Sequence, residues 1–211
     1  DSLVAGIYNV TITDDDGCTL TQSINISQPV SGMNVQSIIS HVDCYGAQTG
    51  SIAITVTGQT PPFQYSWSNG SGAATLNNII AGNYILTVID NNGCQQIDTI
   101  EVLQPLAPLS IQLDPTNVPC YNQISGEIDL LVSGGTPSYT YAWSNGSSSQ
   151  DLLGVGTGLY SVVVTDANGC SASGSTFLTQ PTMALTASAA ISGVSCYGGN
   201  DGLIDVSVVG G

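Results

Sequence analysis

Six cysteines carry the chemistry that the residue spacing of this chain shows most clearly. They form two series with a common interval of 76 residues: Cys18, Cys94 and Cys170, and then Cys44, Cys120 and Cys196. Zinc sites usually contain closely spaced cysteine pairs or several histidines, whereas this chain has no Cys-x-x-Cys pair and only one histidine, His41. The cysteines therefore predict disulfides and an oxidising compartment.

More than one disulfide connectivity fits this spacing. We favour bridges within each repeat because they would stabilise domains of this size, although both cysteines must then lie at one end of the domain. These bridges are Cys44–Cys94 and Cys120–Cys170, with Cys18 and Cys196 pairing outside this sequence. The alternative joins consecutive repeats through Cys18–Cys44, Cys94–Cys120 and Cys170–Cys196. Pairs of longer range remain open as well.

A short acidic or amide-rich turn precedes each cysteine of the first series. The turns read DDDGC, DNNGC and DANGC, and their candidate calcium ligands are Asp14, Asp16, Asp90 and Asp166. They resemble the opening of a calcium loop but lack the later ligands of an EF-hand. We favour a tight hairpin in which Asp-Gly or Asn-Gly reaches positive φ, and calcium remains a weaker alternative.

The elements that position these turns and cysteines read as short strands. In PPFQYSWSNG, at residues 61–70, aromatic residues alternate with polar ones, and PSYTYAWSNG repeats the pattern at residues 137–146. Alternation of this kind is typical of a strand with one buried face. Within one repeat we expect strands at about 35–42, 51–57, 63–68, 74–79, 84–89 and 97–103. We predict that Trp67 and Trp143 lie in the cores.

About seven short strands in each 76-residue period, with a core tryptophan on the third, predict an all-β chain of tandem immunoglobulin-like sandwiches. Tyr84 and Tyr160 each follow a Gly-x turn, where such sandwiches often have a corner tyrosine that belongs to the core. Gln-Pro pairs divide the chain, because proline cannot continue a strand ladder. The expected parts are a C-terminal fragment of a repeat at 1–29, whole repeats at 30–105 and 106–181, and an N-terminal fragment at 182–211.

The charge composition excludes whole classes of function. The chain has no lysine or arginine, has 15 acidic residues and carries a formal net charge of −15. Without cations it cannot neutralise phosphates, so we expect neither nucleic-acid binding nor attraction to anionic membranes. No apolar run is long enough for membrane insertion. No catalytic triad recurs with the period, and His41 has no catalytic partner, so we predict that the chain is not an enzyme and needs no cofactor.

The recurring motifs together resemble a known family. The pattern begins with CYG, continues with Gly-Gly-Thr-Pro before the aromatic strand and WSNG, and ends with G-x-Y, a D-x-N-G-C turn and Gln-Pro. It departs mildly at Gln59, which replaces the second glycine of Gly-Gly, and at Asn122, which replaces the glycine after Cys-Tyr. It resembles the SprB-type repeat of very large adhesins on the surface of gliding bacteria, which are exported by type IX secretion. The resemblance implies an extracellular stalk or filament with an adhesive role and a part in gliding motility. Its expected partners are neighbouring repeats of the same long chain, surface polysaccharide or other cell-surface proteins.

Two further expectations concern the surface. Ser2 and Thr99 stand in Asp-Ser/Thr-apolar triplets that resemble the O-glycosylation signal of this bacterial group. The alternative function is a multivalent glycan-binding module that gains avidity from repetition, with loop tyrosines as its contacts. These tyrosines are Tyr45, Tyr121 and Tyr197, and packing at the junctions between repeats is the reading that we prefer for them.

Overall fold

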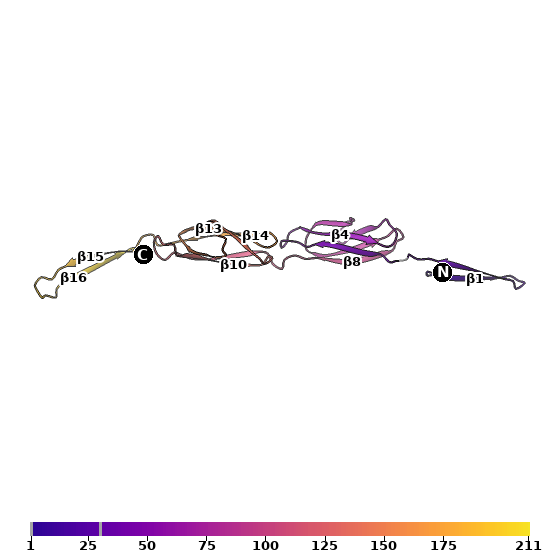
Figure 1. Ribbon diagram of the computed structural model, residues 1–211, viewed down its shortest axis with the longest axis horizontal. Coiled ribbons are helices and arrows are strands. Elements are labelled where there is room, and N and C mark those ends of the chain that lie inside the picture. Colours follow the sequence, from indigo (N-terminus) through magenta and orange to yellow (C-terminus); the bar gives the residue numbers. More distant parts are fainter. Residues whose placement is uncertain (1, 30) are drawn as a thin grey trace. The chain divides into compact units, whose positions relative to one another are not determined.

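The computed structural model describes residues 2–29 and 31–211 and builds them from sixteen strands without a helix (Figure 1). Accordingly, none of the described residues belongs to a helix that is long and apolar enough to cross a membrane. Residue 30, at which we expect the first whole repeat to begin, lies outside the described residues, as does Asp1 of the first glycosylation triplet.

The chain forms two compact units. The first unit comprises Asp1–Ser40, Ser51–Asn78 and Gly82–Val102. It contains a hairpin of β1 (Gly6–Thr13) and β2 (Thr19–Ile26). It also contains a sandwich of two three-stranded antiparallel sheets, with strand orders β3-β4-β6 and β5-β7-β8. Their bounds are β3 (Asn34–Ser40), β4 (Gly50–Thr57), β5 (Gln64–Trp67), β6 (Thr75–Ile79), β7 (Gly82–Ile89) and β8 (Gln95–Val102).

The second unit comprises His41–Gly50, Ile79–Ala81 and Leu103–Gly211. Its sandwich has the same plan, with sheets ordered β9-β10-β12 and β11-β13-β14, followed by a hairpin of β15 and β16. The bounds are β9 (Ser110–Thr116), β10 (Gly126–Ser133), β11 (Thr140–Trp143), β12 (Leu152–Val155), β13 (Gly158–Thr165), β14 (Ser171–Leu178), β15 (Thr186–Ser192) and β16 (Leu203–Val209). The segment His41–Gly50, which connects β3 to β4 along the chain, therefore packs with the second sandwich.

The 76-residue period is a structural period, because nearly all corresponding strands begin and end at equivalent residues. β3 at Asn34–Ser40 corresponds to β9 at Ser110–Thr116, and β7 at Gly82–Ile89 corresponds to β13 at Gly158–Thr165. Each sandwich has six strands rather than about seven, because only one short strand fits between the aromatic strand and the next long one. The prediction of all-β, immunoglobulin-like sandwich repeats is confirmed.

Alternating apolar side chains from both sheets fill each core. In the second sandwich, the buried cluster consists of Ile128, Leu130, Trp143, Leu152, Val162, Val164 and Leu178. In the first, Ile52 and Leu86 are fully buried on facing sheets, and Trp67 is 3% exposed. The aromatic strands β5 and β11 are therefore core strands, as predicted, and their tryptophans are among the most buried large side chains of each sandwich.

The two hairpins at the ends of the chain are equivalents of sandwich strands without the facing sheet. β1–β2 corresponds to β7–β8, and β15–β16 corresponds to β9–β10. Val10 and Ile12 are exposed, whereas their equivalents Leu86 and Val88 are fully buried. A hairpin alone has only one layer, so its apolar face has nothing to pack against among the described residues.

Candidate functional site

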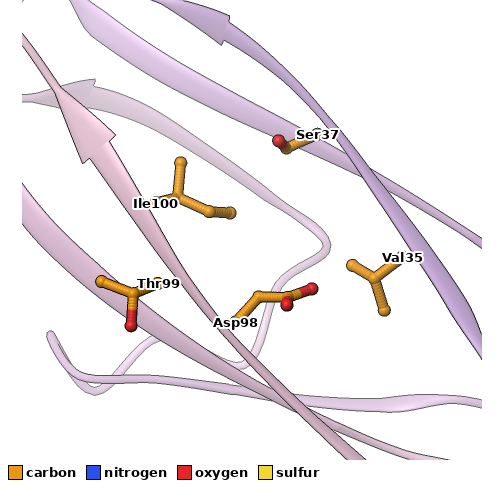
Figure 2. A pocket seen from close by; sticks show the side chains of 5 residues that line it. All are labelled: Val35, Ser37, Asp98, Thr99 and Ile100. Atoms are coloured by element: carbon orange, nitrogen blue, oxygen red, sulfur yellow. The ribbon is translucent and has the colours of Figure 1, made fainter.

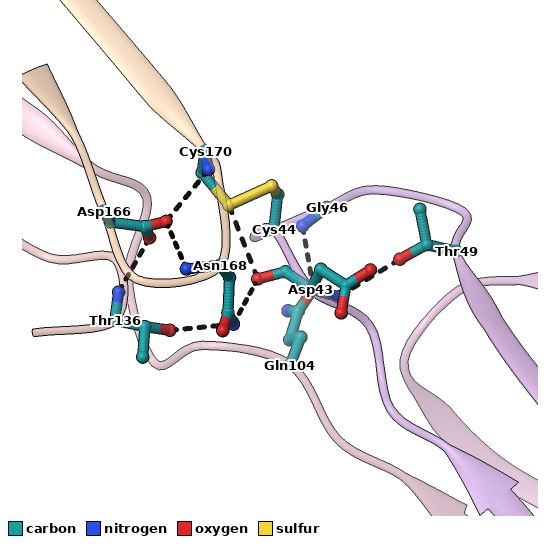
Figure 3. Close-up of a disulfide and its surroundings, with 9 residues drawn as sticks. All are labelled: Asp43, Cys44, Gly46, Thr49, Gln104, Thr136, Asp166, Asn168 and Cys170. Carbon is teal, nitrogen blue, oxygen red and sulfur yellow. Dashed lines mark hydrogen bonds between the residues drawn. A yellow bond between two sulfur atoms is a disulfide. The ribbon is translucent and has the colours of Figure 1, made fainter.

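The disulfide in this structure joins Cys44 to Cys170, which are 126 residues apart in sequence and have Cα atoms 5.7 Å apart. Cys44 lies in the loop after β3, and Cys170 ends the turn between β13 and β14 (Figure 3). The bond thus connects one repeat to the next. It contradicts the within-repeat pairs Cys44–Cys94 and Cys120–Cys170 that we favour from sequence, and it belongs to the longer-range class.

The direction of β8 explains why the within-repeat pair does not form. Val42 N donates to Leu103 O at 2.9 Å, so the segment just after β3 lies beside the residue just after β8. Cys94 lies just before β8, whose eight residues rise about 3.3 Å each. Cys94 is therefore separated from the Cys44 end by the length of this strand, far beyond the roughly 7 Å between Cα atoms that a disulfide tolerates. The second repeat has the same arrangement, with Val118 N donating to Thr179 O.

The alternative pairing of consecutive repeats is also contradicted. Cys44 and Cys170 bond to each other rather than to Cys18 and Cys196. Cys18, Cys94, Cys120 and Cys196 are unpaired and exposed in the described part of the chain.

An aspartate holds the turn that presents Cys170. Asp166 Oδ1 accepts from Cys170 N and Asn168 N, both at 2.9 Å, and its Oδ2 accepts from Thr136 N at 2.8 Å. Burial alone raises the pKa of Asp166, but the backbone hydrogen bonds from Thr136, Cys170 and Asn168 outweigh that effect. The pKa of Asp166 therefore lies below its ordinary value. The ionised carboxylate thus fixes the turn and the position of the cysteine.

The same turn precedes the other cysteines of this series. Asp90 Oδ1 accepts from Cys94 N at 2.7 Å and Asn92 N at 2.9 Å, and Asp14 Oδ1 accepts from Cys18 N at 2.8 Å. At Asp90 too, burial raises the pKa, and backbone hydrogen bonds from Cys94, Thr60 and Asn92 lower it to a value below the ordinary one. The sequence prediction of tight Asp-Gly or Asn-Gly hairpins is confirmed here, since Gly17, Gly93 and Gly169 have positive φ.

The calcium alternative remains a prediction for these turns. No group of three or more His, Cys, Asp or Glu side chains that could hold a metal occurs in residues 2–29 and 31–211. Both carboxylate oxygens of Asp90 and of Asp166 already accept backbone hydrogen bonds. Asp16, the remaining candidate, is exposed.

The loop that carries Cys44 is fixed by residues at the end of its own repeat. Gln104 Oε1 accepts from Gly46 N at 2.8 Å, and His41 Nδ1 accepts from Leu103 N at 3.1 Å. His41 therefore orders the backbone, and Asn117 holds the equivalent position in the second repeat, where its Oδ1 accepts from Thr179 N at 2.8 Å. The glutamines of two Gln-Pro pairs, Gln104 and Gln180, are thus structural residues of the cysteine loops, in addition to marking boundaries.

One amide completes the contact around the disulfide. Asn168 Nδ2 donates to Asp43 O and to Thr136 Oγ1, both at 3.0 Å (Figure 3). Cys170 Sγ lies 3.4 Å from the same Asp43 carbonyl oxygen. Sequence reasoning missed the role of Asn168, because Asn-Gly already explained the turn. The only available signal was the recurrence of asparagine at Asn92 and Asn168.

Of the predicted core aromatics, Trp67, Trp143 and Tyr84 are buried, and Tyr160 is partly buried against the core. Trp67 Nε1 donates to Ala73 O at 2.8 Å, and Trp143 Nε1 donates to Ser149 O at 2.9 Å, so each buried indole satisfies its polar atom in the segment that follows its own strand. Tyr160 OH donates to Gly156 O at 3.1 Å, as a corner tyrosine does. Tyr84 is 8% exposed at the equivalent position.

The loop tyrosines remain accessible. Tyr45 is 49% exposed even though its neighbour Cys44 forms the disulfide, Tyr121 is 40% exposed, and Tyr197 is fully exposed. About half of the Tyr45 side chain is thus covered, and packing of these tyrosines at the junctions between repeats stays a prediction.

The candidate glycosylation residues lie on the surface. Ser2 and Thr99 are both exposed. Thr99 lies on β8 next to a shallow hollow between β8 and the unpaired edge of β3, which Figure 2 shows with its lining residues Val35, Ser37, Asp98, Thr99 and Ile100. Modification of either hydroxyl stays a prediction.

Structural comparison returned immunoglobulin-domain proteins. The N-terminal eight Ig domains of Down Syndrome Cell Adhesion Molecule, isoform 1.30.30, are similar with a TM-score of 0.47 and 13% identity over 83% of this chain. This chain spans 28% of that one. The complex of Dpr2 Ig1-Ig2 with DIP-Theta Ig1-Ig3 gives a TM-score of 0.28 and 15% identity, and the match covers 83% of this chain and 73% of the other. No curated protein matches the sequence.

A family model matches the sequence twice. The description of the model is SprB repeat, and the matches cover residues 37–72 and 113–148. The second match begins and ends 76 residues after the first, in step with the structural period. Each match runs from β3 or β9 through the Cys-Tyr loop and the aromatic strand to the turn that follows it. Two parts of the chain are thus similar to the SprB repeat, and each covers the first half of one sandwich.

Proposed function

We propose that this chain is a structural and adhesive segment of a very large bacterial cell-surface adhesin, where its repeats form part of a stalk or filament. The observation that carries the proposal is the strict repetition of one SprB-type sandwich, including its cysteine turn and loop. In such an array each domain contacts its neighbours, and repetition adds length rather than a new active site.

One property of the chain supports an extracellular location, and another supports an extended array of repeats. The disulfide between repeats is typical of proteins that fold in oxidising compartments. The net charge of −15 without any cation favours solubility and repulsion between successive domains. We extend the proposal to export by type IX secretion and to a part in gliding motility, on the strength of the family resemblance.

Small-angle scattering tests the stalk. A compact protein of this length has a radius of gyration of about 17 Å. The proposal predicts a value well above this one and a distance distribution with a long tail, and a compact particle would contradict it.

Labelling of cells tests location. Antibodies raised against the chain should bind intact, unpermeabilised cells of the source bacterium, and a deletion strain is the matched control. Signal that appears only after permeabilisation would contradict a surface location. Loss of movement over a surface in the deletion strain would support the part in gliding.

The exposure of the loop tyrosines favours one second candidate, a glycan-binding module. Tyr45 and Tyr121 offer accessible rings at equivalent places in successive repeats, and repetition would convert weak binding into avidity. A glycan array tests this candidate with the native chain and a Tyr45→Ala, Tyr121→Ala double variant. Binding that the double variant loses would support it, and an array without any binding would remove it.

A further inference from the structure

We infer that Cys94 and Cys120 are the two sides of further inter-repeat disulfides of the kind that joins Cys44 to Cys170. Cys94 would bond the loop cysteine of a repeat that precedes it, and Cys120 would bond the turn cysteine of a repeat that follows it. The inference rests on the proposed function, since it requires an array of such repeats. Its consequence is a covalent link, in addition to the peptide chain, at the junctions that Cys94 and Cys120 would join.

The turn side of this disulfide is present twice with the same geometry and with an asparagine in the turn. We call residues 166–170 and 90–94 the Asp–Cys turns. Cys170 N donates to Asp166 Oδ1 at 2.9 Å, and Cys94 N donates to Asp90 Oδ1 at 2.7 Å. Cys94 is exposed, so its thiol is held in a formed turn and open to a partner.

The loop side, held by a glutamine side chain, is also present twice. We call residues 43–46 and 119–122 the Cys–Tyr loops. Gln104 Oε1 accepts from Gly46 N at 2.8 Å in the first, and Gln180 Oε1 accepts from Asn122 N at 3.0 Å in the second. The loop around Cys120 is therefore held as the loop around Cys44 is, although of these two cysteines only Cys44 has a bonding partner among the described residues.

The hydrogen bond from the turn asparagine to the loop carbonyl, which lies next to the disulfide, can form again at Cys94 and Cys120. Asn168 Nδ2 has two donor hydrogens, and its partners are Thr136 Oγ1 and Asp43 O. In the described part of the chain, Asn92 Nδ2 bonds Thr60 Oγ1 at 3.0 Å and leaves its second hydrogen for a partner.

The acceptor from the neighbouring repeat is a main-chain carbonyl, which any residue can supply. Asp43 provides this oxygen in the observed junction, and Pro119 occupies the same position in the second Cys–Tyr loop. The difference between an aspartate and a proline therefore does not prevent the contact.

The turn that ends at Cys18 sets a limit on the inference. Asp16 stands where Asn92 and Asn168 stand in the other turns. A carboxylate has no hydrogen to donate to a carbonyl, and its charge repels the carbonyl oxygen. We therefore exclude Cys18 from the inference, because its turn lacks the amide contact.

The chemistry of the step is thiol–disulfide exchange. One cysteine thiolate attacks an external disulfide RSSR and releases RSH, and the second cysteine then attacks the mixed disulfide and releases another RSH. Two thiols lose two electrons and two protons in total, and RSSR is reduced to two RSH. Oxidised glutathione supplies RSSR in the experiment below.

An extended chain tests the inference. A second copy of residues 106–181 is inserted after residue 181, with Cys170→Ser in the original repeat and Cys120→Ser in the inserted copy. Any bond between Cys120 and the Cys170 of the inserted copy must then cross a junction. After oxidation with glutathione we expect this bond in non-reducing peptide mapping, and a monomer on a non-reducing gel.

The mirrored chain is the control, with Cys120→Ser in the original repeat and Cys170→Ser in the inserted copy. It should form Cys44–Cys170, which shows that the insertion is tolerated, and the inserted Cys120 should stay a thiol. Matching circular dichroism spectra of the two chains establish that both are folded. In the test chain, a Cys120 that remains a thiol, that bonds Cys94, or that links two molecules into a dimer would overturn the inference.

Discussion

Gln59 has a backbone conformation that is unfavourable for a residue with a side chain. Its φ is 59°, and the equivalent residue of the second sandwich is Gly135 with a φ of 63°. A Cβ at Gly135 would lie 2.7 Å from Asp166 Oδ2. Gln59 has such a Cβ in the first sandwich, and there Thr60 N lies 3.4 Å from Asp90 Oδ2. In the second sandwich, the equivalent distance from Thr136 N to Asp166 Oδ2 is 2.8 Å.

We expect Gln59→Gly to stabilise the first sandwich by about 1 kcal/mol, because it removes the left-handed backbone penalty. It also removes Gln59 Oε1, which is buried without a hydrogen-bond partner among the described residues. The reciprocal change, Gly135→Gln, should destabilise the second sandwich. Chemical denaturation of both variants checks these results, and equal effects of one sign would contradict the account.

Asp166 should make the stability of the second sandwich depend on pH. Its pKa in the folded chain lies below the ordinary value, since burial raises it less than the backbone hydrogen bonds lower it. Its contribution is therefore fully present above the unfolded pKa of about 3.9 and is lost as pH falls through the folded pKa. Asp166→Asn should lower the thermal midpoint at pH 7, because an amide accepts at only one of its two polar atoms.

The comparison across pH makes this prediction specific. The difference between the native chain and Asp166→Asn should shrink below about pH 4, where Asp166 of the unfolded chain begins to take up its proton while the folded carboxylate is still ionised. Asp129→Asn, on an exposed residue of β10, is the matched control and should show no such pattern. A difference for Asp166→Asn that stays constant down to pH 2 would count against the role given to the carboxylate.

At the scale of elements, β10 has one face in the core and one face exposed to solvent. Leu130 is fully buried, whereas the next residue, Leu131, is 54% exposed. Leu130→Ala should destabilise the sandwich by about 2–5 kcal/mol through lost burial and a cavity. Leu131→Ala should change the free energy of unfolding by less than about 0.5 kcal/mol. Urea denaturation measures both changes in the free energy of unfolding. Similar decreases for the two variants would contradict the division of β10 into a buried and an exposed face.

The strands could be predicted from sequence because each has a strong local pattern. The alternation in residues 51–57 predicts a strand that is found at Gly50–Thr57, and the aromatic strand expected at 63–68 is found at Gln64–Trp67. Turn chemistry fixes their ends, as Asn-Gly does after Trp67 and Asp-Gly does before Cys18. The period then extends each assignment to the other copies.

The disulfide could not be predicted in the same way. Its connectivity depends on which end of the sandwich each cysteine occupies, and that depends on the direction of β8 relative to β3 rather than on any local pattern. A bond between cysteines 126 residues apart also depends on the following repeat, which no single repeat encodes. Gln104 and Asn168 escaped notice for the same reason, since their partners are remote in sequence.

At the scale of the whole molecule, the Cys44–Cys170 bond is the feature that distinguishes covalently cross-linked repeats from repeats that only the peptide chain connects. It closes 126 residues of chain, for which loop entropy predicts a stabilisation of about 5 kcal/mol, with native values more often about 2–4 kcal/mol. Such a bond resists separation of the two repeats as well as their unfolding.

We expect Cys44→Ser to lower the thermal midpoint of the oxidised chain clearly, because it removes this constraint on the unfolded state. Cys120→Ser is the matched control, since Cys120 holds the equivalent position in the next repeat but is unpaired and exposed. It should leave the midpoint unchanged. Calorimetry measures both variants, and equal midpoints would show that the bond contributes nothing to stability.

The most direct test of the account is the disulfide map of the native chain. Because the chain has no lysine or arginine for trypsin, digestion without reduction uses a protease that cleaves after aromatic residues, followed by mass spectrometry. The account predicts one cross-linked pair, Cys44 with Cys170, and thiols at the other four cysteines. A Cys44–Cys94, Cys120–Cys170 or Cys18–Cys44 peptide would contradict it.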